Sequence, residues 1–124
     1  MTLRLRQWVA LAAMVVVLAA CTPDQLALFN VVTEPYRDVL TDDQLAVLRD
    51  CEAHGNYEAV SASGRYRGAY QFSQSTWDLV ADRHFPWLVS ADPAATEPVW
   101  QDMMARALWS ERGGAPWPHC GPRV

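Results

Sequence analysis

The chain has 124 residues, a length that suits one small domain. Its formal net charge is −4, and its ten basic residues are all arginines that form no run or patch. Because binding to nucleic acid requires a basic surface, this composition excludes nucleic acid as an expected partner.

Residues 1–20 have the layout of a secretory signal. Arg4 and Arg6 precede an apolar run over residues 8–20, which is shorter than the roughly 20 apolar residues of a membrane span. The run ends in Leu18-Ala19-Ala20-Cys21, which resembles the lipobox of bacterial lipoproteins. This resemblance implies that Cys21 is lipidated and becomes the new N-terminus. An ordinary signal peptide with a chance cysteine, or an uncleaved anchor, is the alternative.

Residues 21–40 are expected to form a lipidated N-terminus and a tether. The segment contains Pro23, Pro35 and scattered polar residues, which predict at most a short helical turn. The folded domain is expected over residues 41–124.

Helical spacing of apolar residues predicts the first helix of this domain from Thr41 to just before Gly55. Thr41 and Gln44 match the capping box that starts helices. A second helix is predicted from about residue 73 to residue 84. In the third, Thr96 is the expected N-cap and Arg112 the approximate end.

Between the first two helices, residues 57–70 alternate aromatic and small polar residues. Ser63-Gly64-Arg65 has the composition of a turn, so a small β hairpin is predicted here. The expected fold class is therefore α+β, mainly α with a small β hairpin.

Cys51 and Cys120 remain once Cys21 is assigned to the lipid. In an exported protein they are expected to form a disulfide, worth roughly 4 kcal/mol on the loop-entropy model. Two free thiols are the alternative. The three histidines share no metal-ligand spacing, so neither a metal nor another cofactor is expected; they are His54, His84 and His119.

Glu52 directly follows Cys51 and precedes a stretch rich in aromatic residues. A carboxyl group packed against aromatic rings has a raised pKa and can act as a general acid for glycosidic cleavage. Taken alone, however, a Glu at the end of a helix is more often a solvated surface residue.

Three segments of the sequence favour a catalytic Glu52 over a solvated surface residue. They are residues 50–57 (DCEAHGNY), 64–77 (GRYRGAYQFSQSTW) and 117–121 (WPHCG). In this order and at this spacing they resemble the resuscitation-promoting factor domain, a transglycosylase-like family. The resemblance covers about residues 45–121. It implies a compact lysozyme-like fold and cleavage of the β-1,4 bond between MurNAc and GlcNAc in peptidoglycan.

The resemblance also implies roles for individual residues. The family's catalytic Glu follows the first Cys of its disulfide, which matches Glu52. Its Gln-Phe-Ser-Gln-Ser-Thr-Trp segment lines the saccharide groove, which makes Gln71, Thr76 and Trp77 candidate substrate-binding residues.

Further aromatic residues are weighed by their positions. Tyr66, Tyr70 and Trp117 are added as groove candidates because they sit in loop-like segments and a flat ring suits the face of a pyranose. Helical spacing also suits Trp77 and Trp100 to the core. Arg65 and Arg67 suit acidic groups of peptidoglycan, but they suit a solvated turn equally well.

This sequence departs from the family pattern at three positions. It has His54 in place of a glycine and Tyr57 in place of a frequent Trp. Near the C-terminus it lacks one aromatic residue at Gly114, which puts the groove wall there in doubt.

A second catalytic carboxylate is not expected, because the family implies a single catalytic Glu. Asp50, Glu58 and Asp78 are the nearby candidates, and the sequence directs none of them at the groove. The muramyl sugar would then close on its own hydroxyl to give an anhydro product. Attack by water, which gives a plain reducing end, is the alternative.

The function expected from these residues is peptidoglycan cleavage in cell-wall remodelling, by an enzyme lipid-anchored to the outer face of the bacterial cytoplasmic membrane. Its expected partners are glycan strands and the membrane, with a cell-wall endopeptidase as a further candidate. The rival is a catalytically weak peptidoglycan-binding or signalling lipoprotein on the same fold.

Overall fold

A computed structural model describes residues 21–124, so the expected secretory signal lies outside the described residues. This part of the chain forms four α-helices and three short 3-10 helices. They are α1 (Pro23–Thr33), η1 (Glu34–Tyr36), α2 (Asp42–Ala53), α3 (Gln74–His84), η2 (Pro86–Leu88), α4 (Pro98–Arg112) and η3 (Gly121–Arg123).

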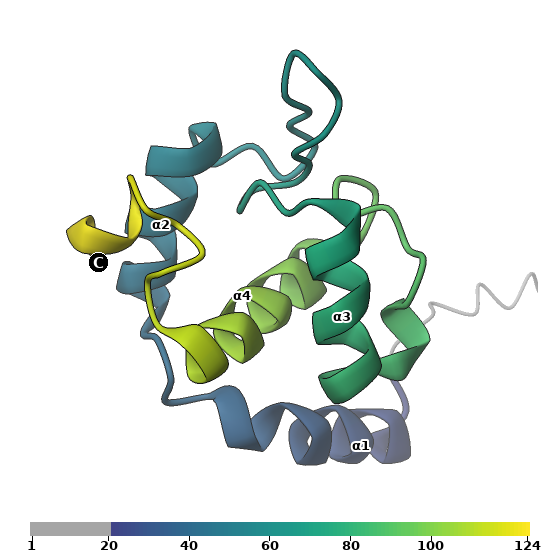
Figure 1. The fold of residues 1–124 in the computed structure, drawn as a ribbon. Helices are drawn as coiled ribbons and strands as arrows, with labels where there is room; N and C mark the ends of the chain where they lie inside the picture. Colours follow the sequence, from purple (N-terminus) through teal and green to yellow (C-terminus); the bar gives the residue numbers. More distant parts are fainter. Residues whose placement is uncertain (1–20) are drawn as a thin grey trace, which may run out of the picture.

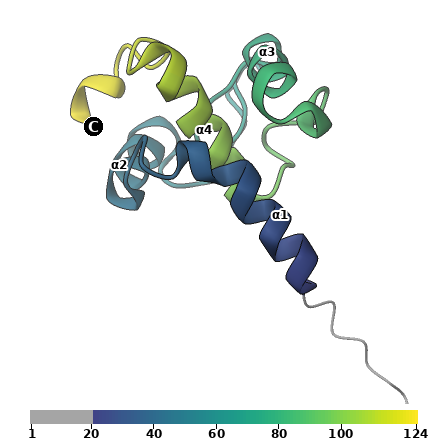
Figure 2. The ribbon, with the colours of Figure 1, turned by 90° about the horizontal axis from the view of Figure 1, so that it is seen from below.

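Helix α4 lies at the centre of the domain. Figures 1 and 2 show α2 and α3 on either side of it and α1 running across below. Met104, Ala105 and Ala107 make much of α4 fully buried. Leu48 of α2 and Trp77 of α3 pack into the same core. The sequence places this core at the centre because apolar residues cover most of α4, whereas α2 and α3 each have one apolar face.

The three predicted domain helices are confirmed. The capping box at the start of α2 is complete, because Thr41 accepts from the Gln44 backbone while the Gln44 side chain accepts from the Thr41 backbone. Helix α4 begins one residue later than predicted, with Glu97 as its N-cap. The Thr96 hydroxyl instead donates to the Asp92 carbonyl oxygen at 2.8 Å.

The expectation of at most a short helical turn in residues 21–40 is wrong, because α1 is a regular helix of 11 residues. Thr22 and Gln25 form a second capping box, and Pro23 suits the first helical position. Packing also stabilises the helix, since the Phe29 ring meets the edge of Trp100 at a centroid distance of 5.5 Å.

The predicted small β hairpin is not formed. In the described chain, residues 57–72 contain two isolated antiparallel bridges, Val60 with Arg67 and Arg67 with Phe72. Positive φ angles at Gly64, Gly68 and Gln71 turn the backbone too often for strands to extend. The segment is a compact loop, here called the 57–72 loop.

A buried glutamine holds the 57–72 loop against α4. Gln101 is 1% exposed, and its side-chain oxygen accepts from the Ala69 N–H at 2.9 Å. Its amide nitrogen donates to the carbonyl oxygens of Tyr57 and Thr96. Gly68 passes so close that a Cβ there would lie 2.6 Å from the Gln101 side-chain oxygen. The close approach therefore requires glycine at position 68.

Replacing Gln101 with Leu is expected to destabilise the domain by about 3 kcal/mol, because one buried and two part-buried hydrogen bonds to backbone groups are lost. Urea unfolding would measure the change. The matched control is Gln74→Leu, at an exposed glutamine, which should cost less than about 1 kcal/mol. Equal effects of the two substitutions would show that Gln101 does not hold the loop.

Candidate active site

Glu52 lies in the last turn of α2, at a helix end whose backbone is well defined. His54 ends the helix in the left-handed region with φ of 52°, and its N–H donates to the Asp50 carbonyl oxygen at 3.0 Å. The Gly55 N–H donates to the Arg49 carbonyl oxygen at 3.1 Å. A left-handed position favours glycine, which accounts for the glycine that the resembling family has where this chain has His54.

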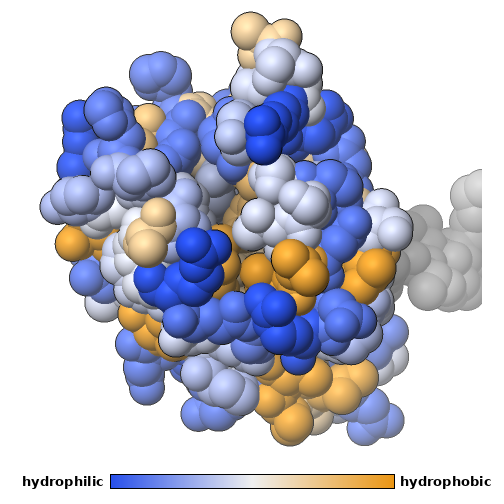
Figure 3. Space-filling model, in the orientation of Figure 1, coloured by the Kyte–Doolittle hydropathy of each residue, from blue (hydrophilic) through white to orange (hydrophobic). Residues whose placement is uncertain are grey.

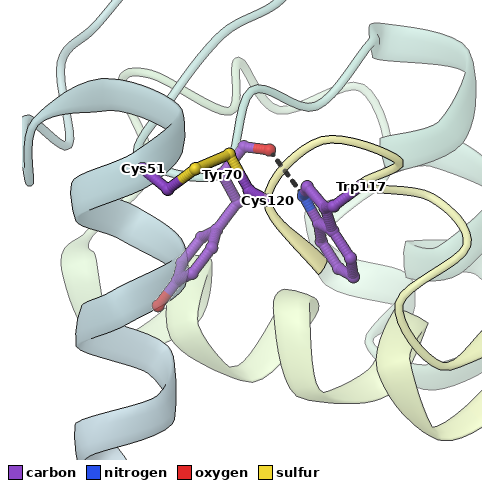
Figure 4. The surroundings of a disulfide bond; sticks show 4 residues. All are labelled: Cys51, Tyr70, Trp117 and Cys120. Atoms are coloured by element: carbon purple, nitrogen blue, oxygen red, sulfur yellow. Dashed lines mark hydrogen bonds between the residues drawn. A yellow bond between two sulfur atoms is a disulfide. The ribbon is translucent and has the colours of Figure 1, made fainter. Parts of the chain in front are cut away.

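The predicted disulfide between Cys51 and Cys120 is confirmed. It links residues 69 apart in sequence, with a Cα–Cα distance of 5.8 Å. Figure 4 shows Tyr70 and Trp117 beside it, with the Trp117 Nε1–H donating to the Tyr70 carbonyl oxygen at 2.9 Å. The disulfide therefore ties the residue preceding Glu52 to the loop and to the C-terminal segment.

The electrostatic surroundings of Glu52 favour its protonated form. Partial burial raises the pKa of its carboxyl group above the ordinary value, while the positive charge of nearby His119 acts in the opposite direction. The C-terminal end of a helix carries a partial negative charge, which also disfavours the carboxylate. A raised carboxyl pKa of this kind suits general acid catalysis.

Replacing His119 with Ala is expected to raise the pKa of Glu52 further, because the electrostatic interaction with His119 that lowers this pKa is removed. A general acid works while protonated, so the alkaline limb of a pH–rate profile should move to higher pH. The control is His54→Asn, which should leave the alkaline limb unchanged. Asparagine tolerates the left-handed backbone at this position. An unchanged or lowered alkaline limb in the His119 variant would contradict this account of the Glu52 environment.

A shallow depression of about 70 Å³ brings several predicted groove residues together. Its lining includes Tyr66, Tyr70, Gln71, Thr76 and Trp117. Tyr70 and Trp117 also lie beside the disulfide (Figure 4), whereas Glu52 is not among the residues that line the depression. The depression thus brings together residues of the 57–72 loop, of α3 and of the C-terminal segment.

Two residues of the Gln71–Trp77 segment are held at the rim of this depression. Gln71 has a positive φ of 53°, unusual for a residue other than glycine, and its side chain donates to the Gly68 carbonyl oxygen at 3.0 Å. Such backbone strain is often found at functional sites. Thr76 accepts from the Ser73 hydroxyl at 3.0 Å and keeps its own hydroxyl hydrogen for another acceptor.

The aromatic groove candidates differ in how far their side chains are exposed. Tyr66 is 42% exposed, whereas Tyr70, Trp77 and Trp117 are at most 4% exposed. Trp77 is a core residue whose indole N–H donates to the Leu88 carbonyl oxygen, so its ring is not accessible to a sugar. Tyr70 and Trp117 were expected to present an open ring face because they lie in loop-like segments. This expectation is wrong, since both rings are buried. They shape the floor of the depression.

A polar network beneath the site was not predicted. Asp102 of α4 accepts from the hydroxyls of Tyr57 and Tyr70, and Arg49 of α2 donates to both Asp102 and Tyr70. Burial and the adjacent carboxylate raise the pKa of Tyr57 to about 12 and that of Tyr70 further. Both phenols therefore stay protonated and link the 57–72 loop to α2 and α4.

The aromatic residue missing at Gly114 is matched by another ring from α4. Trp109 stacks on Trp117 with a centroid distance of 5.9 Å and an interplanar angle of 25°. A Cβ at position 114 would lie 3.2 Å from the Trp109 ring. Trp109 therefore occupies the space beside Gly114.

The two loop arginines have different environments. Arg67 forms a bidentate ion pair with Asp92, at 2.7 and 2.6 Å, which lowers the pKa of that carboxyl group. Arg65 is exposed and lies over the Tyr66 ring, 5.5 Å from its centroid. Of these two arginines, only Arg65 forms no ion pair among the described residues, and the ring that it covers, Tyr66, lines the depression.

The carboxylates near Glu52 in sequence have other surroundings. Asp78 accepts from the Gln74 side chain and from the Ser90 N–H. Glu58 lines a different hollow, between the 57–72 loop and the start of α4. Among the described residues, no carboxylate contributes to the pKa shift of Glu52. Residues 21–124 also contain no cluster of three metal-ligating side chains.

Similarity to known proteins extends over most of the folded domain. The sequence profile of the transglycosylase-like domain family matches residues 39–120. The chain is 32% identical over 81 residues to "Probable transglycosylase SceD" of Staphylococcus carnosus, and 37% identical over 79 residues to the protein of that name in Staphylococcus aureus. Each match covers 64% of this chain and 33% of the relative, so the chain spans about a third of their length. No solved structure matches significantly.

Proposed function

Because this chain belongs to the transglycosylase-like domain family, we propose that it cleaves the β-1,4 glycan backbone of peptidoglycan with Glu52 as its general acid. The observation that supports this most strongly is the placement of Glu52. Its pKa is raised, and it follows a disulfide that adjoins the depression lined by Gln71, Thr76 and Tyr66. The proposed sugar contacts are these three residues, with Tyr70 and Trp117 as the floor beneath them.

In the proposed reaction, Glu52 donates its proton to the glycosidic oxygen, and the bond between this oxygen and the muramyl C1 breaks. The C6 hydroxyl oxygen of the same muramyl sugar then bonds to C1, and its proton passes to the Glu52 carboxylate. The acid is restored, and the product is an anhydro sugar. One carboxyl group serves both steps, which fits a site where no second carboxylate influences Glu52.

The proposal includes the position of the enzyme. We infer that Cys21, which is exposed and free of disulfide bonding, carries a lipid that holds the domain at the outer face of the cytoplasmic membrane. None of the helices in residues 21–124 is long and apolar enough to cross a bilayer. The intact mass of membrane-extracted protein tests this part, because a mature form that starts at another residue would refute it.

Incubation with purified peptidoglycan separates the enzyme from its rival, a binding or signalling lipoprotein. We expect soluble glycan fragments to accumulate with time and with protein concentration. Co-sedimentation with intact peptidoglycan that releases no fragments would favour the rival. Neither binding nor release would contradict both functions.

A further inference from the structure

An exposed apolar surface lies on the side of the molecule away from Glu52. It comprises Leu26 and Leu28 of α1, Trp87 of η2 and Val99 of α4, and it is here called the apolar flank. These side chains are between 39% and 64% exposed. Figure 3 shows hydrophobic residues gathered along the lower edge of the molecule, over α1. A contiguous exposed apolar surface of this kind marks an interaction site.

The residues of the apolar flank line a hollow. It encloses about 610 Å³ between α1, η2 and the start of α4, and its lining is mainly apolar. Trp100 also lines the hollow, and its ring is 5.5 Å from those of both Phe29 and Trp87. Trp87 remains 55% exposed in spite of this contact. Its ring is therefore held with one side against the protein and the other free.

The position of Cys21 indicates what covers this hollow. Cys21 lines the hollow itself, and in sequence it directly follows the apolar run of residues 8–20. A lipid on Cys21 would hold this end of the hollow at a bilayer surface, and so would an uncleaved anchor. In Figure 2 the first turns of α1 project from the rest of the domain, so they would reach that surface first.

We propose that the apolar flank lies in the boundary between headgroups and acyl chains of the membrane that holds Cys21. This inference rests on the membrane attachment proposed above. Tryptophan prefers that boundary because its ring is apolar and its N–H is polar. Glu97, the charged residue that lines the hollow, is acidic, and so is Asp24 in the first turn of α1. Apolar burial therefore drives the contact, and attraction to anionic lipids does not.

Contact between the apolar flank and the membrane would strengthen the attachment that one lipid chain provides. A single acyl chain binds a membrane only marginally, and stable attachment needs a second interaction. The contact would also orient the domain. Figure 1 shows α1 at the lower edge, whereas the end of α2 that carries Glu52 and the start of α3 that carries Thr76 lie on the upper side. The depression would then face away from the bilayer.

Tryptophan fluorescence tests the proposal on the membrane-extracted protein, reconstituted in phosphatidylcholine vesicles with brominated acyl chains. Bromine quenches only tryptophans that reach the lipid. We expect the wild type to lose clearly more fluorescence than Trp87→Phe, whereas Trp109→Phe, beside the depression, should behave as the wild type. Leu28→Glu should lower the quenching of Trp87. The matched control Val47→Glu, at an exposed valine on α2, should leave it unchanged.

Equal quenching in the wild type and Trp87→Phe would overturn the proposal. So would a Trp87 that neither bromolipid nor aqueous iodide reaches, because that result would indicate a second copy of the chain on the flank. The intact mass of the vesicle-bound protein separates the two failures. Attached protein with Trp87 in water refutes the flank contact alone, whereas protein that does not associate with vesicles refutes the attachment as well.

Discussion

Replacing Glu52 with Gln is expected to slow glycan cleavage by about 10²–10⁴-fold, the range that general acid catalysis contributes. Glutamine keeps the size of the side chain but has no proton to give to the leaving oxygen. Release of soluble fragments from purified peptidoglycan measures the effect. The matched control is Glu58→Gln, at an exposed Glu that lines a different hollow, and it should keep the wild-type rate. A Glu52 variant as fast as the wild type would remove Glu52 from the mechanism.

The Tm of Glu52→Gln distinguishes a loss of catalysis from a loss of folding. The folded-state pKa of Glu52 is raised, so the folded domain binds this proton more tightly than the unfolded chain does. Above that pKa the ionised carboxylate therefore disfavours folding, and below the unfolded-state pKa this cost is absent. Glutamine removes the charge, so at neutral pH the Tm should stay equal or rise. A large fall in Tm would mean that the substitution disturbs the fold.

Removing the disulfide with Cys51→Ala and Cys120→Ala is expected to lower the free energy of unfolding by about 4 kcal/mol. The bond joins residues 69 apart, so its loss frees most of the domain in the unfolded chain. For a domain of this size, the Tm should fall by roughly 15–30 °C. Thermal unfolding followed by circular dichroism measures this shift.

The control for the disulfide is Cys21→Ser, measured in the unlipidated chain. Cys21 is exposed and forms no disulfide, so its replacement should leave the Tm unchanged. Reductant should lower the Tm of the wild type and have no effect on the double variant. A double variant as stable as the wild type would show that the disulfide does not stabilise the domain.

The helices and the disulfide could be predicted because their signals are local or few. Capping residues and apolar spacing fix the start of α2, and a single pair of cysteines remained for the disulfide. Thr22 and Gln25 give the same capping signal for α1, but Pro23 and Pro35 together are also typical of a tether, so the sequence does not predict this helix. Pro23 in fact occupies the first helical position, where proline is favoured.

The 57–72 loop could not be predicted, because its conformation depends on residues far away in sequence. Gln101 makes hydrogen bonds that replace those of a hairpin, and no local pattern marks it as the partner of Ala69. The same holds for Asp102, whose polar network joins three segments. Burial of Tyr70 and Trp117 likewise follows from tertiary packing, whereas their sequence neighbours indicate exposed loops.

The candidate site depends on both kinds of information. The sequence pattern predicts Glu52 as the catalytic acid, whereas its raised pKa comes from partial burial, which only the folded structure shows. Gln71 and Thr76 follow from the motif, whereas the strained backbone at Gln71 does not. Arg65 and Arg67 lie two residues apart and are chemically alike, and only the ion pair of Arg67 with Asp92 distinguishes them.

Mass spectrometry of the soluble fragments that the wild type and Glu52→Gln release from purified peptidoglycan tests the central claim most directly. The account predicts new muramyl ends that are lighter by one water than reducing ends, formed by the wild type and not by the variant. Plain reducing ends would contradict closure on the sugar's own hydroxyl and indicate attack by water. The same fragments at the same rate from both proteins would contradict the assignment of Glu52 as the catalytic acid.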